Sequence, residues 1–82
     1  MSTRLEELYP KGNPWRDAIL EAEGCSDEDS KILDTPVGSV LGQQILHAMR
    51  SAQTIINMGM DMKHEAMIRR VVAEQMVVWY YG

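Results

Sequence analysis

The chain has 82 residues and a net charge of −4, which suits one small domain, 1–82, near the size at which a single hydrophobic core is marginal. Twelve Asp and Glu outnumber eight Lys and Arg, so no basic stripe is available for phosphate contacts and we expect no nucleic-acid partner. The one cysteine, Cys25, excludes an internal disulfide and fits a reducing compartment. Without a signal-peptide pattern or an apolar run of about 18 residues, we expect a cytoplasmic protein with no membrane contact.

The acidic residues are concentrated in the first part of the chain. Residues 1–35 carry nine acidic and four basic side chains, a net of −5, whereas residues 36–82 have a net of +1. This division predicts an acidic lead-in, 1–35, followed by a helical unit, 36–82. The acidic part could face a basic partner or could simply be a solvated surface.

The lead-in contains signals for short helices, first a short turn through Tyr9 and then a better-defined helix. Asn13 followed by Pro14 is typical of an N-cap with proline at the first helical position. Gly24 suits a helix end. We expect this helix to pack on the rest of the chain through Trp15, because an indole buries the most area.

The connector from Cys25 to Thr35 is acidic and only weakly helical. Ser26 and Asp29 form a loose capping box, which predicts one or two turns within residues 27–33. Alternating acidic residues match a calcium loop in part, but Lys31 stands where an oxygen ligand belongs and no closing glutamate follows. We therefore expect no calcium site.

The strongest pattern runs from Pro36 to Met58. Thr35 before the proline predicts the helix start, and Gly59 predicts a left-handed end. The expected buried side consists of Val37, Leu41, Ile45, Ala48, Met49, Ala52, Ile55 and Ile56. The expected outward side is polar and nearly uncharged, and consists of Ser39, Gln43, His47, Arg50, Ser51, Thr54 and Asn57. The glycines Gly38 and Gly42 leave room for the close approach of another backbone.

A second long helix is predicted from Asp61 to Tyr81, with Asp61 as its N-cap. Its apolar side is expected to contain Ile68, Val71, Val72, Gln75, Val78 and Trp79. Its exposed side is expected to contain Lys63, Arg69, Arg70, Ala73 and Glu74. His64 falls near the apolar side; if it is buried and neutral, protonation should destabilise the fold at mildly acidic pH.

Together these patterns predict an all-α fold: a long antiparallel hairpin, about 36–58 and 61–81, with one or two short N-terminal helices packed on it. Five of the seven methionines lie from Met49 to Met67, and flexible thioethers suit contact surfaces as well as cores. Three consecutive rings, Trp79, Tyr80 and Tyr81, cannot all face one core, so at least one tyrosine should be exposed or in an interface. We expect a homo-oligomer, with a dimer built on the hairpin favoured.

Catalytic and metal-binding patterns are missing, so we expect no enzyme activity, no metal and no cofactor. His47 and His64 have no second zinc-type ligand at helical spacing. Cys25 has acidic neighbours, which should raise its pKa and lower its nucleophilicity. No glycine-rich phosphate loop is present.

Three functional hypotheses follow. The first is a small acidic interaction module that binds and modulates or inhibits a larger protein partner; in size and charge it is similar to phage-encoded and other accessory factors. Either the acidic half or the aromatic end would make that contact, the latter through Trp79, Tyr80 and Tyr81. The alternative is an oligomeric binder of a small polar or anionic ligand such as a nucleotide. Its ligand would lie against Gln43, His47, Arg50 and Thr54. The third hypothesis is a DNA-binding regulator with a helix-turn-helix, which would need a basic recognition helix.

Overall fold

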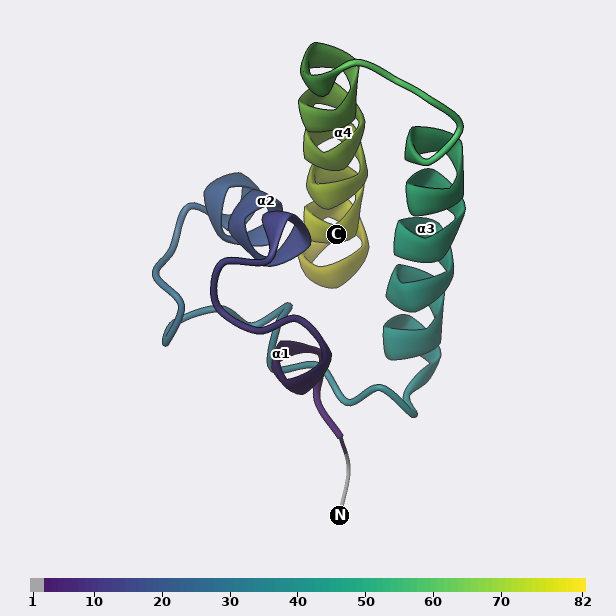
Figure 1. Ribbon diagram of the computed structural model, residues 1–82. Coiled ribbons are helices and arrows are strands. Elements are labelled where there is room, and N and C mark those ends of the chain that lie inside the picture. The colour runs from purple at the N-terminus through teal and green to yellow at the C-terminus, as the bar shows by residue number, and fades with distance from the viewer. Residues whose placement is uncertain (1–2) are drawn as a thin grey trace.

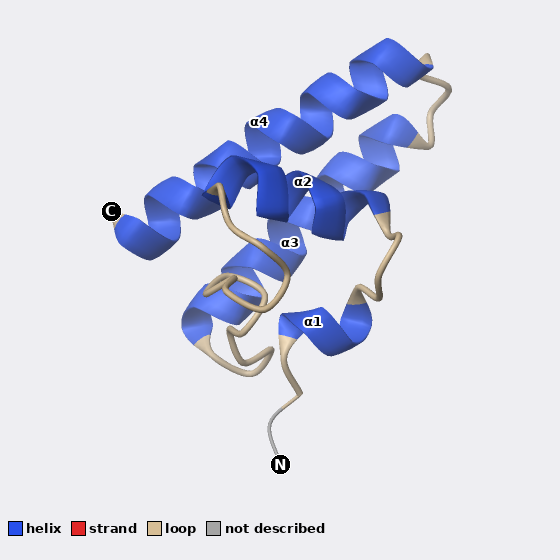
Figure 2. Cartoon of the chain, turned by 90° about the vertical axis from the view of Figure 1, so that its left-hand side faces the viewer, coloured by secondary structure: helices blue, strands red, loops and turns tan. Residues whose placement is uncertain are grey.

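The computed structural model describes residues 3–82, which contain four helices and no strand. These are α1 (Leu5–Leu8), α2 (Pro14–Glu23), α3 (Val40–Ile56) and α4 (Met62–Tyr81). Helix α4 packs against both α2 and α3, and a short loop joins α3 to α4 at one end of the molecule (Figure 1). Helix α2 lies across this pair in the view of Figure 2. The prediction of an all-α fold is confirmed.

Helix α2 begins and ends as the sequence predicts. The Asn13 side chain accepts a hydrogen bond of 2.8 Å from the backbone N–H of Trp15, and Pro14 is the first helical residue. Gly24 adopts the left-handed conformation with φ 71° and closes the helix. Both signals are local, so no distant contact changes them.

Helix α3 begins at Val40, four residues later than predicted. Thr35 does not cap it, because the Thr35 hydroxyl donates to the carbonyl oxygen of Lys31. Pro36 instead forms an antiparallel bridge with Arg4, which keeps this backbone extended. Ser39 takes over as N-cap and accepts a hydrogen bond of 2.9 Å from Gly42 N–H. The start predicted at Pro36 was therefore wrong, because a long-range pairing competes with the local signal, and the helix also ends two residues early.

The buried side of α3 follows the predicted one in most positions, including Ile45, Met49, Ala52 and Ile56. Leu46 is also buried, whereas Ile55 is exposed.

The buried side of α4 differs from the prediction. Ala73 and Met76 are fully buried, whereas Val71, Gln75 and Val78 face solvent. The prediction took the apolar side from the periodicity of this helix alone, whereas the positions of two neighbours, α2 and α3, select the sector that is buried. A small residue at Ala73 lets a neighbouring helix approach closely.

Two further predictions about α4 were wrong in the same way. Arg69 was expected in solvent, but its guanidinium carbon lies 5.8 Å from the centre of the Trp15 ring. His64 was expected near the core, but it is exposed, and its Nδ1 lies 2.8 Å from the Asp61 carboxylate. The predicted destabilisation at mildly acidic pH required a buried His64, so its premise is wrong. The Asp61 cap itself is confirmed, since Asp61 accepts a 2.9 Å hydrogen bond from His64 N–H.

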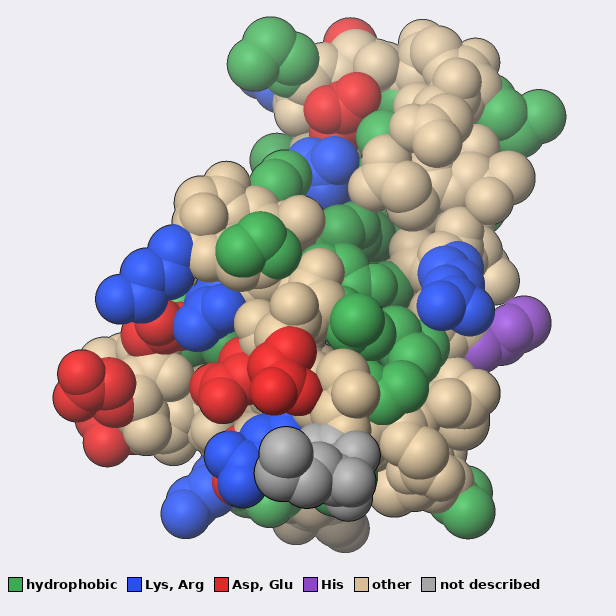
Figure 3. Space-filling view, turned by 60° about the horizontal axis from the view of Figure 1, so that its bottom comes forward, with side chains coloured by type: hydrophobic (Ala, Val, Ile, Leu, Met, Phe, Trp, Pro, Cys, Tyr) green, Lys and Arg blue, Asp and Glu red, His purple; other side chains and the backbone are tan. Residues whose placement is uncertain are grey.

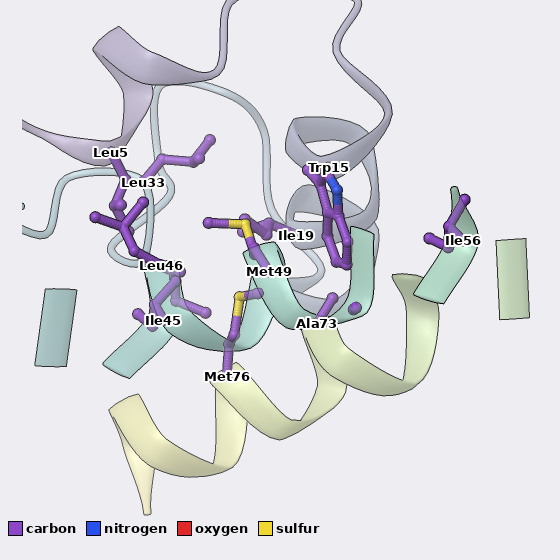
Figure 4. Packing of buried hydrophobic residues seen from close by; sticks show 12 residues of the cluster. Leu5, Trp15, Ile19, Leu33, Ile45, Leu46, Met49, Ile56, Ala73 and Met76 are labelled. Atoms are coloured by element: carbon purple, nitrogen blue, oxygen red, sulfur yellow. The ribbon is translucent and has the colours of Figure 1, made fainter. Parts of the chain in front are cut away.

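The core gathers side chains from all four helices and from the connector (Figure 4). The largest fully buried side chains are Leu5, Ile19, Ile32, Leu33, Ile45, Met49 and Met76. Figure 4 shows Leu5 and Leu33 beside Leu46, so α1 and the connector cover one end of α3. The connector forms turns rather than the helix suggested for residues 27–33, because its Ile32 and Leu33 are held in the core.

One buried charge fixes the lead-in. Arg16 Nε and Nη2 donate to the two carboxylate oxygens of Asp27, at 2.6 and 2.8 Å. Its Nη1 donates to the backbone carbonyl oxygens of Glu6, at 3.0 Å, and Tyr9, at 2.7 Å. A bidentate pair with two further acceptors satisfies the guanidinium in a site almost closed to water. Arg16 thereby joins α1, α2 and the connector.

A second polar centre joins α2 to the end of α4. The Glu23 carboxylate accepts hydrogen bonds from the Ser30 hydroxyl at 2.6 Å, the Lys31 backbone N–H at 2.8 Å and the Tyr81 hydroxyl at 2.6 Å. Burial alone would raise the pKa of Glu23, but these hydrogen bonds to its charged form outweigh burial and lower it. The acidic connector is therefore partly an internal structure and not only a solvated surface.

Candidate functional site

The outward side of α3 carries the four residues predicted to contact a small ligand: Gln43, His47, Arg50 and Thr54. All four are exposed on one helix. The Gln43 amide donates to the carbonyl oxygen of Val37 at 2.7 Å, and the Thr54 hydroxyl donates to that of Arg50 at 3.0 Å. Two of the four side chains are thus already bonded to the backbone of their own chain, and His47 and Arg50 supply the outward-facing chemistry.

The aromatic end of α4 is split in its use. Trp79 packs against the core, whereas Tyr80 and Tyr81 are exposed, with ring centres 4.8 Å apart in an edge-to-face arrangement. The prediction that at least one tyrosine is exposed is confirmed. The Tyr81 hydroxyl is committed to Glu23, and this hydrogen bond raises the pKa of Tyr81 to about 12. The Tyr81 side chain is nevertheless the more exposed of the two, at 57% against 38% for Tyr80.

The outward side of α4 carries an apolar row that we call the outward row: Met67, Val71 and Val78. Each of these side chains is 59% exposed. They lie four and seven residues apart, so they follow one side of the helix, opposite Ala73 and Met76. The sequence pattern had assigned Val71 and Val78 to the interior. The apolar residues of this helix cover more of its circumference than its two neighbours bury, so one apolar sector remains in solvent.

A shallow groove runs between α2 and α4, with a volume of about 250 Å³. Its lining includes Asp17 and Glu21 from α2 and Arg69 and Arg70 from α4. Arg69 stacks on Trp15 and reaches Glu65 at 3.9 Å, but its buried Nε has no hydrogen-bond partner within residues 3–82. Acidic and basic groups on facing walls compensate each other, so the groove has no clear preference for a charged ligand.

The acidic connector borders a polar hollow of about 360 Å³. It is lined by Glu6, Asp27, Glu28, Asp29, Ser30, Lys31 and Asp34. Figure 3 brings this end of the molecule forward and shows acidic side chains gathered beside lysine and arginine side chains. Arg16 neutralises Asp27, and Arg4 lies 3.1 Å from Asp34. Glu28 and Asp29 leave the rim of this hollow acidic.

Metal-ligating side chains are dispersed in the described part of the chain, and the Cys25 thiol lies beside acidic groups. Residues 3–82 contain no group of three or more His, Cys, Asp or Glu side chains placed to hold a metal ion. Burial raises the pKa of the Cys25 thiol, and the Glu23 and Asp29 carboxylates raise it further. The thiol therefore stays protonated near neutral pH and is a weak nucleophile, as predicted.

Comparison with known proteins gives no relative. No protein-family model, curated protein or solved structure matches the chain. Within residues 3–82, every helix is too short or too polar to cross a membrane.

Proposed function

We propose that this chain is a helical interaction module that forms a homodimer through α4 and, as a dimer, binds and modulates a larger protein partner. The observation that carries the proposal is the outward row, Met67, Val71 and Val78, each 59% exposed. Full burial of such a side chain contributes roughly 1.5–3 kcal/mol. Three of them along one helix are a substantial driving force for association.

A second copy of the chain suits this row. When two α4 helices pair antiparallel about a twofold axis near residue 72, Met67 of one copy lies opposite Val78 of the other. The same register places Arg70 near Glu74 of the other copy, twice by symmetry. The apolar centre and the complementary charges at its edge therefore favour the same arrangement. In this proposal α3 and α4 act as an antiparallel hairpin whose α4 side is the dimer contact.

The proposed dimer leaves the polar hollow beside the acidic connector free for the larger partner. Its acidic rim, with Glu28 and Asp29, suits a basic surface. The exposed Tyr81 ring would extend that contact, since its hydroxyl bonds Glu23, which also bonds Ser30 and Lys31 at the hollow. We therefore propose a partner with a positively charged docking surface, bound with an affinity that falls as salt is added.

Solution mass tests the dimer. Light scattering should give twice the chain mass for the parent protein, and Val71→Lys should be monomeric with an unchanged helical spectrum. The matched control is Val40→Lys, since Val40 is 88% exposed but lies at the start of α3, away from the outward row. A monomeric parent at high concentration, or a Val71→Lys variant that stays dimeric, would contradict the proposal.

The partner contact has its own test. A doubly charge-reversed variant, Glu28→Lys with Asp29→Lys, should stay dimeric. It should no longer bind the basic partner that the parent protein binds at low salt and releases at high salt.

The alternative function, binding of an anionic small ligand on the outward side of α3, is tested by Arg50→Ala: nucleotide binding measured by calorimetry should vanish while the dimer persists. Equal nucleotide binding by the parent and this variant would remove that alternative.

A further inference from the structure

The α3–α4 loop and the first turns of α4 concentrate soft metal-binding donors. Met58, Met60 and Met62 occupy alternate positions and are followed by His64 and Met67. Ten residues thus hold four of the seven methionines and one of the two histidines of the chain. Thioether sulfur and imidazole nitrogen are neutral donors that favour Cu(I) over hard cations.

These donors are accessible, unlike the methionines of the core. Met58 and Met62 are 83% and 84% exposed, and Met60, Met67 and His64 are also exposed. Leaving these long apolar side chains in water forgoes the stabilisation that their burial would contribute. Hydrophobic packing within the described chain does not account for them, so a ligand or another contact is the natural explanation.

Two of the donors, His64 and Met67, lie in helix α4, which fixes their backbone positions. His64 and Met67 are three residues apart in α4, so their Cβ atoms are about 5–6 Å apart on the same side of the helix. The His64 ring is oriented by Asp61, whose Oδ1 lies 2.8 Å from Nδ1. The same oxygen accepts the His64 backbone N–H, so the helix cap holds the carboxylate in place. Nε2 is left free, and a carboxylate behind the far nitrogen is the usual support of a metal-bound histidine.

The loop can supply the remaining donors. Met60 directly precedes the cap residue Asp61, and Met62 is the first residue of α4. Met58 precedes Gly59, which turns the chain with φ 101°. Three rotatable bonds let each thioether adapt its position, and Cu(I) accepts a small number of soft ligands without strict geometry.

We propose that residues 58–67 bind one Cu(I) ion, with His64 Nε2 and Met67 Sδ as the helical ligands and one or two of the sulfurs of Met58, Met60 and Met62 completing the set. The site differs from a zinc or calcium site in having no carboxylate or thiolate ligand; Asp61 acts only by orienting His64. The inference does not depend on the proposed dimer, although Met67 belongs to both surfaces. Ag(I) is the probe of choice, because it has the same preference for soft donors and does not change oxidation state.

The first test follows each methionine methyl group by NMR. The protein carries Cys25→Ser, because a thiol also binds Ag(I), and is labelled with ¹³C at the methionine methyl groups. On titration with silver nitrate, the methyl signal of Met67 and those of one or two of Met58, Met60 and Met62 should shift and saturate at one equivalent, together with the His64 ring signals. Met49 and Met76, which are buried, should not move. Shifts that spread to the buried methionines, or that grow without saturation, would overturn the proposal.

The second test uses matched leucine variants, since leucine keeps the volume of methionine and removes the sulfur. The triple change Met58→Leu, Met60→Leu and Met62→Leu should lower Ag(I) affinity at least about tenfold, the loss typical of removing even a supporting group. His64→Gln should do the same, whereas the control Met49→Leu with Met76→Leu should bind like the parent. Unchanged affinity in the triple variant would overturn the site. An affinity for Zn²⁺ equal to that for Ag(I) would overturn the assignment to a soft ion. If the site prefers Ag(I), competition with a Cu(I) chelator extends the result to copper.

Discussion

The two ends of this small bundle are built differently. At the end that carries α1 and the connector, polar groups are buried or half-buried and satisfied: Arg16 has four acceptor atoms, and Glu23 has hydrogen bonds from the connector and from the end of α4. At the end where α3 and α4 are joined, Met58 and Met62 face solvent and Asp61 with His64 forms a single exposed pair. The first end specifies the fold, and the second leaves chemically distinctive groups free.

This contrast separates residues kept for folding from residues available for binding. A buried, fully bonded polar group is strongly destabilising to lose, because its partners are left unsatisfied. An exposed side chain without partners contributes little to stability. Substitutions at the two ends should therefore differ in free energy of unfolding by far more than their chemical similarity suggests.

Among the polar and surface residues of the two ends, the largest effect is expected at Arg16. Arg16→Met should lower the free energy of unfolding by about 2 kcal/mol, because Asp27 and the carbonyl groups of Glu6 and Tyr9 lose their donor. Urea unfolding followed by circular dichroism measures it. The control is Arg4→Met: its ion pair with Asp34 is exposed to solvent, so the loss should stay below about 0.5 kcal/mol. Equal losses for the two variants would remove the distinction between a structural and a surface arginine.

The next effect concerns the start of α3. A Cβ atom at Gly42 would overlap the carbonyl oxygen of Pro36, whereas a Cβ at Gly38 meets nothing within 4 Å. Gly42→Ala should destabilise the fold by about 1–2 kcal/mol, since the overlap outweighs the helix preference of alanine. Gly38→Ala should be neutral or slightly stabilising, because it restricts the unfolded chain at an open position. Thermal unfolding of the pair gives the comparison; a stabilising Gly42→Ala would show that the Pro36 turn moves freely.

A smaller effect, visible through pH, is expected at Glu23. Its pKa is lowered in the folded protein, so its hydrogen bonds stabilise the fold fully above the unfolded pKa near 4.5, and this stabilisation is lost as pH falls through the folded value. The raised pKa of Tyr81 acts in the opposite range: its contribution is complete below about pH 10 and is lost as pH rises toward 12. Glu23→Gln should lose about 1 kcal/mol at neutral pH and show a flatter acid limb. Tyr81→Phe should remove the alkaline limb and flatten the acid limb only in part, because the Tyr81 hydroxyl is one of several groups that lower the pKa of Glu23. Acid and alkaline limbs like those of the parent in both variants would contradict the pairing of Glu23 with Tyr81.

How far the sequence could predict these features depends on the range of the interactions involved. The caps at Asn13 and Asp61 and the end at Gly24 were predicted correctly, because each rests on hydrogen bonds or conformations within a few residues. The start of α3 was not, because Pro36 pairs with Arg4, more than thirty residues away. Nor could Arg16 be recognised as a buried anchor, since its acceptors come from two other segments, the end of α1 and the connector.

The candidate surfaces show the same limit. The outward side of α3 was predicted correctly, as most of its apolar residues pack on one side. The exposed sector of α4 was not, because a helix with two neighbours buries a sector that its own periodicity does not define. The methionines and the histidine of residues 58–67 can be read from the sequence, but a search for zinc ligands considers His, Cys and carboxylates and does not include the thioether of methionine. Only the exposure of Met58 and Met62, and the Asp61 to His64 contact, distinguish them from core methionines.

The smallest effect is expected at the loop end and completes the comparison. Met58→Ala and Met62→Ala should each change the free energy of unfolding by less than about 0.5 kcal/mol, since both side chains lie in solvent. Met49→Ala and Met76→Ala, the same change in the core, should lose about 2–4 kcal/mol through the cavities they leave. A loss above about 1 kcal/mol at Met58 or Met62 in the metal-free protein would mean that these side chains pack in solution, which would assign them to folding. A negligible loss, combined with weaker Ag(I) binding in the leucine variants, would mean that the loop keeps its thioethers for a ligand.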